Sequence, residues 1–258
     1  MVDIKQRLEQ IADSQPYPLL FATISGAHLY GFASLDSDYD LRGVHILPLD
    51  KIIGLHSLQD TIEVSKNTDS LELDLVTHDL YKFCNLLLKR NGYVLEQLYS
   101  PLIVHSTAEH QQLKAIAFDC ITRHHAHHYL GFARTQWRMF GKENPPRVKP
   151  LLYLYRVLLT GIYLMETGKI EANLNNLNQE FNLSYIPDLI ALKVTGTEKE
   201  KVRDLNLEFH QHEYERLTDK LVLASQNSHL ADLPSAKDAL NDFLVQIRLN
   251  NCQSIDIN

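Results

Sequence analysis

Two neighbouring stretches decide the fold: Ser25-Gly26-Ala27-His28-Leu29-Tyr30-Gly31 and, six residues later, Ser37-Asp38-Tyr39-Asp40-Leu41-Arg42-Gly43-Val44. The first is a glycine-bearing turn that follows a short apolar run. A strand that ends in glycine and opens a helix lets backbone N–H groups approach a polyphosphate. In the second stretch the two aspartates are one residue apart, so in a strand both carboxylates project from the same side. Together they predict metal-assisted phosphoryl chemistry.

Each stretch also has a simpler interpretation. Gly26 alone is equally consistent with a tight turn that binds nothing. Acidic residues beside Ser and Gly usually mark a solvated turn. A calcium loop that starts at Asp36 is excluded, because Leu41 and Leu47 occupy the positions that require Gly and Glu. The branched and aromatic residues after Asp38 instead predict a strand that carries Asp40 into a sheet, half buried and in need of a cation.

The hydrophobic pattern changes near residue 106. Before it, the sequence predicts a small α/β unit with helices at about 3–13 and 78–90 and strands near 18–25, 39–47, 60–66 and 70–77. After it, the stretches 106–140, 150–168 and 198–225 have helical periodicity, with Pro145-Pro146 and the polar residues 173–178 as connections. We therefore expect an α+β fold: a mixed sheet with flanking helices in residues 1–106, followed by an all-helical domain in residues 107–258.

The chain resembles a known family in four places. The first is the order of strand, glycine turn, Tyr-Gly and Ser-Asp-x-Asp-x-Arg-Gly-Val. The others are the acidic strand and Lys-Phe helix of Asp74–Cys84, the segment Asn91–Leu98, and the basic pair Lys149 and Arg156. In this order they resemble the nucleotidyltransferases of the DNA polymerase β superfamily, most closely the RNA-repair-associated branch called RlaP-like. The chain differs from the usual pattern at Ala27, where Ser is common, at Gly92, where Pro is, and at Tyr153, where His is.

The resemblance implies a metal-dependent enzyme that moves a nucleoside monophosphate from an NTP to a hydroxyl group. Two Mg²⁺ ions, with Mn²⁺ as an alternative, would be held by Asp38, Asp40 and Asp74, which are the implied catalytic residues. Asp74 would hold the ion that activates the acceptor hydroxyl. Glu72 competes for the third position, because it faces the same way on the same strand; the spacing of Asp74 to Lys82-Phe83 favours Asp74. The implied contacts to the NTP come from Ser25, Gly26, Ser37, Arg42, Lys149 and Arg156.

The acceptor that the resemblance implies is an RNA terminus of tRNA-like kind. The alternatives are a protein side chain, as in toxin–antitoxin systems, and a nucleotide-binding regulator without transfer. A net charge of −7 argues against a surface coated in positive potential. The stretch from Arg123 to Arg156 nevertheless carries seven basic residues against Glu143, with aromatic residues between them, and this composition suits a triphosphate or an RNA backbone. The base preference and the oligomeric state are open.

The remaining composition is typical of a cytoplasmic enzyme that does not associate with a membrane. Hydrophobic residues make up 45% of the 258 residues, enough for a core. The charged, amphipathic N-terminus does not have the pattern of a signal peptide. Cys84, Cys120 and Cys252 are scattered without metal-ligand spacing, so we expect structural thiols. The histidines of 124–128 lack further zinc ligands at suitable spacing, so we expect surface or core residues there.

Overall fold

The computed structural model describes residues 4–55, 58–68, 71–142, 144–196 and 205–253. The chain forms two compact units. Unit 1 comprises residues 1–25, 38–120 and 233–258, and unit 2 comprises residues 26–37 and 121–232. This division differs from the single boundary expected between residues 106 and 107. The motif segment 26–37 belongs to the helical unit, whereas residues 107–120 and the C-terminal helix belong to the unit that contains the sheet.

Unit 1 is built on a five-stranded mixed sheet. Its strands are β1 (Leu19–Ile24), β2 (Tyr39–His45), β3 (Thr61–Thr68), β4 (Leu71–Asp79) and β5 (Ile103–Ser106). Their order in the sheet is β3-β4-β2-β1-β5. The β2–β4 pair is parallel and the other pairs are antiparallel. The four strands expected from the sequence are confirmed, and β5 is an additional edge strand.

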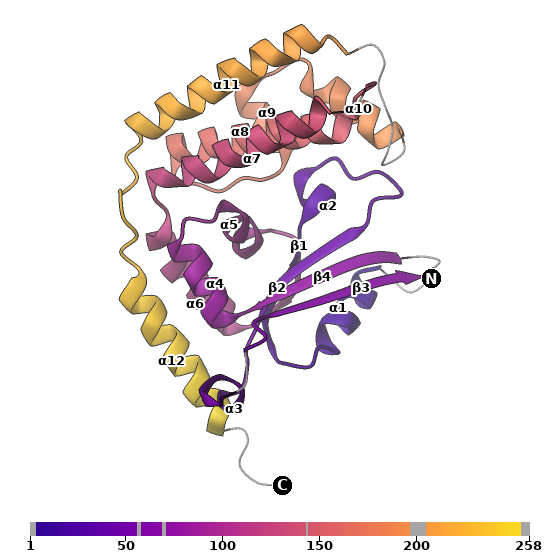
Figure 1. Ribbon diagram of the computed structural model, residues 1–258. Coiled ribbons are helices and arrows are strands. Elements are labelled where there is room, and N and C mark those ends of the chain that lie inside the picture. Colours follow the sequence, from indigo (N-terminus) through magenta and orange to yellow (C-terminus); the bar gives the residue numbers. More distant parts are fainter. Residues whose placement is uncertain (1–3, 56–57, 69–70, 143, 197–204, 254–258) are drawn as a thin grey trace. The chain divides into compact units, whose positions relative to one another are not determined.

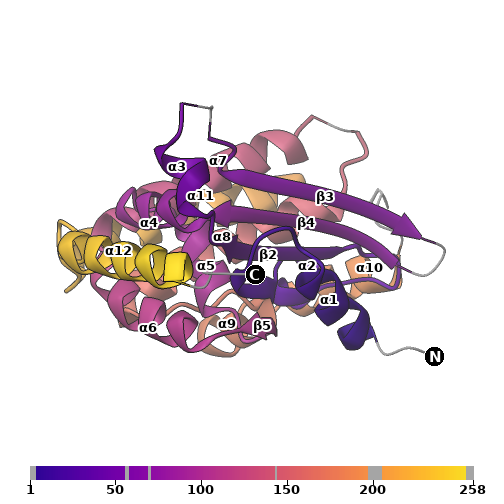
Figure 2. The same cartoon turned by 90° about the horizontal axis from the view of Figure 1, so that it is seen from below.

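Helices cover both faces of this sheet (Figures 1 and 2). The helices of unit 1 are α1 (Ile4–Asp13), α3 (Leu49–Ile53), α4 (Leu80–Leu88), α5 (Gly92–Tyr99), α6 (Ala108–Ala117) and α12 (Lys237–Gln253), with a 3₁₀ turn η1 (Phe118–Cys120). Leu8 and Ala12 of α1 pack with Leu41, Leu73 and Leu75 into an apolar cluster on one face. The other face meets α4, α5 and α6, while α12 packs on α4 and α6.

Gly43 sets how closely two central strands approach. A Cβ atom at this position would lie 2.4 Å from the carbonyl oxygen of Phe21 in β1. Real Cβ atoms essentially never come that close. The Arg-Gly-Val sequence of β2 therefore needs glycine for packing against β1, independently of any ligand.

Unit 2 is helical throughout its regular structure. It contains α2 (Gly26–Tyr30), η2 (Arg123–His125), α7 (Ala126–Phe140), α8 (Val148–Thr167), α9 (Leu174–Phe181), α10 (Ile186–Thr195) and α11 (Leu207–Asn227). The helix α8 is the core of the unit. Among the described residues it is the one helix long and apolar enough to cross a membrane, but 83% of its apolar window is buried within the structure. That degree of burial is the property of a core helix.

The predicted helical stretches differ from the structure in detail. Residues 106–140 are largely helical as expected, and two 3₁₀ turns divide this stretch into α6 and α7. Residues 173–178 were expected to be a connection, but Asn173 caps α9 by accepting a hydrogen bond from the backbone N–H of Asn175. Asparagine is a good N-cap residue, so a polar run can begin a helix. The fold class itself, a mixed sheet with flanking helices and a helical part, is confirmed.

Candidate active site

Asp40 and Asp74 lie side by side on adjacent strands of unit 1. The parallel register of β2 and β4 pairs Asp40 with Asp74, and it pairs Tyr39 with Leu73 on the apolar side. Asp40 is half-buried, as the sequence predicted, and the side chain of Asp74 is 42% exposed. Glu72 is exposed, and it lies one residue before Leu73, where the pairing of β4 with β2 begins. The register therefore favours Asp74 over Glu72 as the partner of Asp40.

Arg42 joins the two carboxylates. Its Nη2 atom donates to Oδ1 of Asp40 at 2.6 Å and to Oδ2 of Asp74 at 2.8 Å. Arg42 is two positions after Asp40 along β2, so their side chains share one face of the sheet. A single cationic nitrogen thus lies between two carboxylate oxygens from different strands.

Tyr93 holds the guanidinium from a third element. Arg42 Nε donates to the hydroxyl oxygen of Tyr93 at 3.1 Å. Tyr93 lies in the first turn of α5, where the side chain of the N-cap residue Asn91 accepts a hydrogen bond from its backbone N–H. Burial disfavours the charged form of Arg42, but Tyr93, Asp40 and Asp74 outweigh burial and raise its pKa above the ordinary value. The Asn-Gly-Tyr segment therefore reaches the candidate site through a residue that the sequence did not single out.

The start of the glycine turn lies next to Asp40. The backbone N–H of Ser25 donates to the carbonyl oxygen of Asp40 at 2.8 Å. Ser25 is fully buried, and among the described residues its hydroxyl has no hydrogen-bond partner. Gly26 follows directly with φ of +59°, a backbone conformation that favours glycine. The first segment of unit 1 therefore ends beside Asp40, at the residue before Gly26.

The strand β2 begins at Tyr39, where the sequence placed it, so Asp38 lies one residue before the strand and strand alternation does not set the direction of its side chain. Asp38 is half-buried.

Ser37, the last residue of the motif segment 26–37 in unit 2, stabilises a turn within that segment. Its hydroxyl accepts a hydrogen bond from the backbone N–H of Ser34 at 3.0 Å and lies 3.0 Å from the Ser34 hydroxyl.

The predicted basic pair lies on α8 and meets the motif segment within unit 2. Arg156 is buried, and its guanidinium lies 3.9 Å from the centre of the Tyr30 ring. Lys149 lies 5.8 Å from the ring centre of Tyr153, which in turn packs edge-on against Tyr30. Guanidinium and ammonium groups are attracted to aromatic faces. Arg156, Lys149 and Gly26 belong to unit 2, whereas Asp38, Asp40, Asp74, Arg42 and Ser25 belong to unit 1.

Within the described residues, no group of three or more His, Cys, Asp or Glu side chains is arranged to hold a metal ion. This holds for the histidines of 124–128, which divide between η2 and the start of α7. His125 is buried, while His124 stacks on His127. The structure thus brings two predicted ligands together, Asp40 and Asp74, with Arg42 between them.

Burial raises the pKa of both Cys84 and Cys120 to about 12, so their thiols stay protonated at neutral pH. Both residues are buried free cysteines, as expected. The side chain of Cys252 lies outside the described part of the chain.

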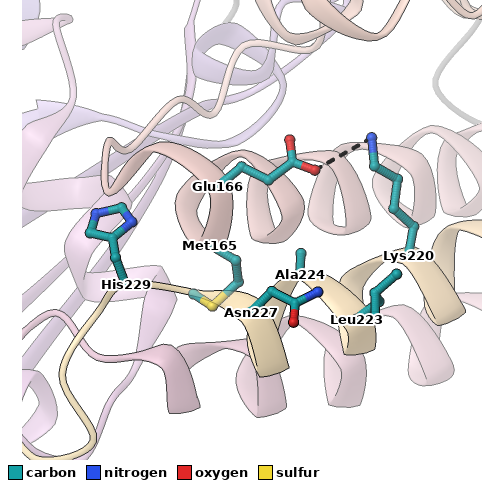
Figure 3. Close-up of a pocket in the computed structure, with 7 residues that line it drawn as sticks. All are labelled: Met165, Glu166, Lys220, Leu223, Ala224, Asn227 and His229. Carbon is teal, nitrogen blue, oxygen red and sulfur yellow. Dashed lines mark ion pairs between the residues drawn. The ribbon is translucent and has the colours of Figure 1, made fainter.

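A pocket in unit 2 lies between the C-terminal parts of α8 and α11 (Figure 3). It has a volume of about 370 Å³ and is lined by Met165, Glu166, Lys220, Leu223, Ala224, Asn227 and His229. Glu166 and Lys220 form an ion pair at 3.5 Å across it. None of the residues predicted to act on a nucleotide lines this pocket.

Comparison with known proteins agrees with these motifs. Residues 1–246 match the family described as RlaP, the RNA repair pathway DNA polymerase beta family. Uncharacterized protein MJ0002 of Methanocaldococcus jannaschii is 29% identical over 218 residues, covering 84% of this chain and 88% of that protein. Uncharacterized protein YcgL of Bacillus subtilis is 27% identical over 175 residues, covering 65% of each chain.

Among solved structures, a nucleotidyltransferase-like protein from Exiguobacterium sibiricum is 12% identical with a TM-score of 0.35, and the match covers 98% of this chain and 90% of that one. The family match extends over nearly the whole chain and includes the strands that carry Asp40 and Asp74. The chain belongs to the RlaP family, and it is a nucleotidyltransferase of the DNA polymerase β type.

Proposed function

We propose that the chain transfers a nucleoside monophosphate from an NTP to a hydroxyl group at an RNA terminus, with divalent ions held by Asp38, Asp40 and Asp74. One observation carries the proposal: carboxylate oxygens of Asp40 and Asp74, on neighbouring parallel strands, both lie within 2.8 Å of one cationic nitrogen. The two side chains therefore converge on a point that a positively charged group already occupies.

The donor set suits a hard cation. Aspartate oxygens are the ligands that Mg²⁺ takes, and Mn²⁺ binds similar sites. Asp38 is two residues before Asp40, at the entrance to the same strand, and would add the third carboxylate. When bound, such ions lower the pKa of the attacking hydroxyl and offset the charge of the leaving pyrophosphate. The β2–β4 register holds two of these carboxylates, those of Asp40 and Asp74, next to each other.

Several residues predicted to contact the NTP carry groups that suit a triphosphate. The buried hydroxyl of Ser25 is a donor next to the glycine turn, and the backbone of Gly26 has no side chain to obstruct an approaching phosphate. Ser37, Arg42, Lys149 and Arg156 are the further proposed contacts. For RNA, Arg134 and Arg138 are exposed on α7 and are four residues apart, so both guanidinium groups face the same side of the helix.

The test is incorporation of α-³²P-labelled NTP into RNA that ends in a free 3′ hydroxyl, with Mg²⁺ present. We expect Asp40→Asn and Asp74→Asn to lower the rate more than about a hundredfold, because loss of even an outer-shell partner of a metal ligand costs 10–100-fold. Glu72→Gln and Asp60→Asn are the matched controls. Glu72 lies on the same strand as Asp74, and Asp60 pairs with Lys82 on another part of the sheet.

Both control variants are expected to keep the wild-type rate. Wild-type incorporation by Asp40→Asn and Asp74→Asn would overturn the proposal. Label on protein in place of RNA would shift the acceptor to a side chain, as in toxin–antitoxin systems. Binding of NTP without transfer to either acceptor would indicate a nucleotide-binding regulator.

A further inference from the structure

The guanidinium of Arg42 uses all of its hydrogen-bonding capacity inside unit 1. Arginine has five N–H donors. Nε donates to the hydroxyl of Tyr93, while Nη1 donates to the carbonyl oxygens of Leu41 at 3.0 Å and Asp74 at 2.6 Å. Nη2 donates to the side chains of Asp40 and Asp74. The residue is only 9% exposed. It is therefore held as a fully satisfied internal cation.

The Nη2 atom occupies the position that a shared divalent ion needs. A magnesium ion requires ligand oxygens at about 2.0 to 2.1 Å. The two oxygens in question lie 2.6 and 2.8 Å from Nη2, so the nitrogen fills the space between them. An ion bound by both carboxylates and an undisplaced guanidinium would overlap, and their like charges would repel.

We propose that Arg42 is a built-in competitor for this cation position, and that its Nη2 arm has to withdraw before Asp40 and Asp74 can share a metal ion. This inference rests on the metal-binding role of the two aspartates in the proposed function. The guanidinium is a rigid planar fork, so Nη2 cannot move without Nε and Nη1. Withdrawal is therefore a rotamer change of the whole Arg42 side chain, which also exchanges the contacts to Tyr93 and to the two backbone carbonyls.

The arrangement has a clear physical benefit for the free enzyme. Two carboxylates that face each other repel, and this repulsion would spread the strands. A guanidinium that bonds to both offsets the repulsion and holds the two groups at a fixed spacing. After withdrawal, the freed N–H groups need an anionic partner, and a phosphate is one that a guanidinium binds well. Arg42 would thereby couple assembly of the metal site to arrival of the nucleotide.

The experiment measures binding of Mn²⁺ alone, without nucleotide, to the full chain by electron paramagnetic resonance. We expect Arg42→Gln to bind Mn²⁺ at least tenfold more tightly than wild type, because the competing charge is gone. Lys82→Gln is the matched control: it removes a cation that pairs with Asp60 at 2.8 Å elsewhere in unit 1, and its affinity should stay within twofold of wild type. The double variant Asp40→Asn/Arg42→Gln should lose the gain.

A second measurement needs no altered charge in the protein. In wild-type protein with ¹⁵N-labelled arginine, Mg²⁺ should shift one guanidinium resonance, and that resonance should be missing from the spectrum of Arg42→Lys. This measurement decides the matter if Arg42→Gln does not fold. An Arg42 resonance that stays unchanged while Mg²⁺ saturates the site would overturn the inference.

The failure of this inference and that of the proposed function give different results. If Mn²⁺ binding depends on Asp40 and Asp74 but Arg42→Gln binds it no more tightly than wild type, Arg42 is a scaffold residue and the metal role stands. If Asp40→Asn and Asp74→Asn bind Mn²⁺ like wild type, the metal role itself is wrong, and the competition proposed for Arg42 is wrong with it.

Discussion

Replacing Arg248 with methionine removes the cation from a carboxylate that has no access to water. Arg248 Nη2 of α12 donates to both carboxylate oxygens of Asp79, at 2.6 and 2.9 Å, and Nη1 donates to the carbonyl oxygen of Leu47. The Asp79 side chain is 0% exposed and that of Arg248 is 8% exposed. Asp79 ends β4, and Leu47 follows β2, so this pair fastens the C-terminal helix to the two strands that carry Asp74 and Asp40.

The size of the effect follows from what Asp79 keeps. After Arg248→Met the carboxylate still accepts hydrogen bonds from the backbone N–H groups of Tyr81 and Leu47. Among the described residues, Arg248 is the cation that pairs with this carboxylate, and the variant removes it. Removing one partner of a buried ion pair costs about 3 to 5 kcal/mol, which in a chain of this size lowers the melting temperature by about 10 °C.

Thermal unfolding followed by circular dichroism measures this loss. Asp79→Asn/Arg248→Met should be more stable than the sum of the two single changes predicts, by more than about 1 kcal/mol, because no buried charge remains. Lys5→Met is the control, since Lys5 makes an exposed pair with Glu9 and should change stability by less than about 0.5 kcal/mol. A loss below about 1 kcal/mol for Arg248→Met would refute the reasoning.

Three further predictions concern stability. Burial lowers the pKa of His45 from 6.5 to about 4. Between these pH values the unfolded chain binds a proton that the folded chain does not, so the free energy of unfolding should fall as the pH drops through this window. In urea titrations at pH 7 and pH 4, this fall should be about 3 kcal/mol smaller for His45→Gln than for wild type. Gly43→Ala should lower the free energy of unfolding by about 2 kcal/mol or more, because the new methyl group meets the Phe21 carbonyl, whereas Gly131→Ala, in open space on α7, should raise it by about 0.5 to 1 kcal/mol. Gly31→Ala should also lower the melting temperature followed by circular dichroism, because φ is +83° and a Cβ atom would lie 2.4 Å from Oδ1 of Asn173. Unchanged stability of the Gly31 or Gly43 variant would contradict the packing described.

Local sequence patterns predicted the elements with strong periodicity and failed where long-range contacts decide. The strand β2 is branched and aromatic, so its existence and the half-burial of Asp40 could be predicted. The short edge strand β5 is partly polar, and α9 begins in a run of asparagines, so neither has a strong local signal. The start of β2 at Tyr39 was also predicted, but the shared face expected for Asp38 and Asp40 assumed strand geometry at Asp38, which lies one residue before the strand.

The division into units could not be predicted for a similar reason. Residues 26–37 look like a loop between two strands of one sheet. In the structure they join unit 2 through Tyr30, which contacts Arg156, and through Gly31, whose carbonyl oxygen accepts a hydrogen bond from Asn175 Nδ2 at 2.7 Å. These contacts link residues more than a hundred positions apart. Likewise, α12 belongs to unit 1 because Arg248 meets Asp79, a pairing with no signature in either segment.

The role of Arg42 shows what a single motif does and does not determine. The alternation of Asp40 and Arg42 along β2 predicts that the arginine shares a face with this aspartate, and this could have been inferred from the sequence. That the guanidinium also bridges to Asp74 depends on the parallel register of β2 and β4, and its link to Tyr93 depends on where α5 packs. The motif therefore supplies the charges, while strand pairing decides which of them neutralise one another. In a free enzyme of this kind the same carboxylates that would hold a metal ion need a substitute cation, and Arg42 is placed to serve as one.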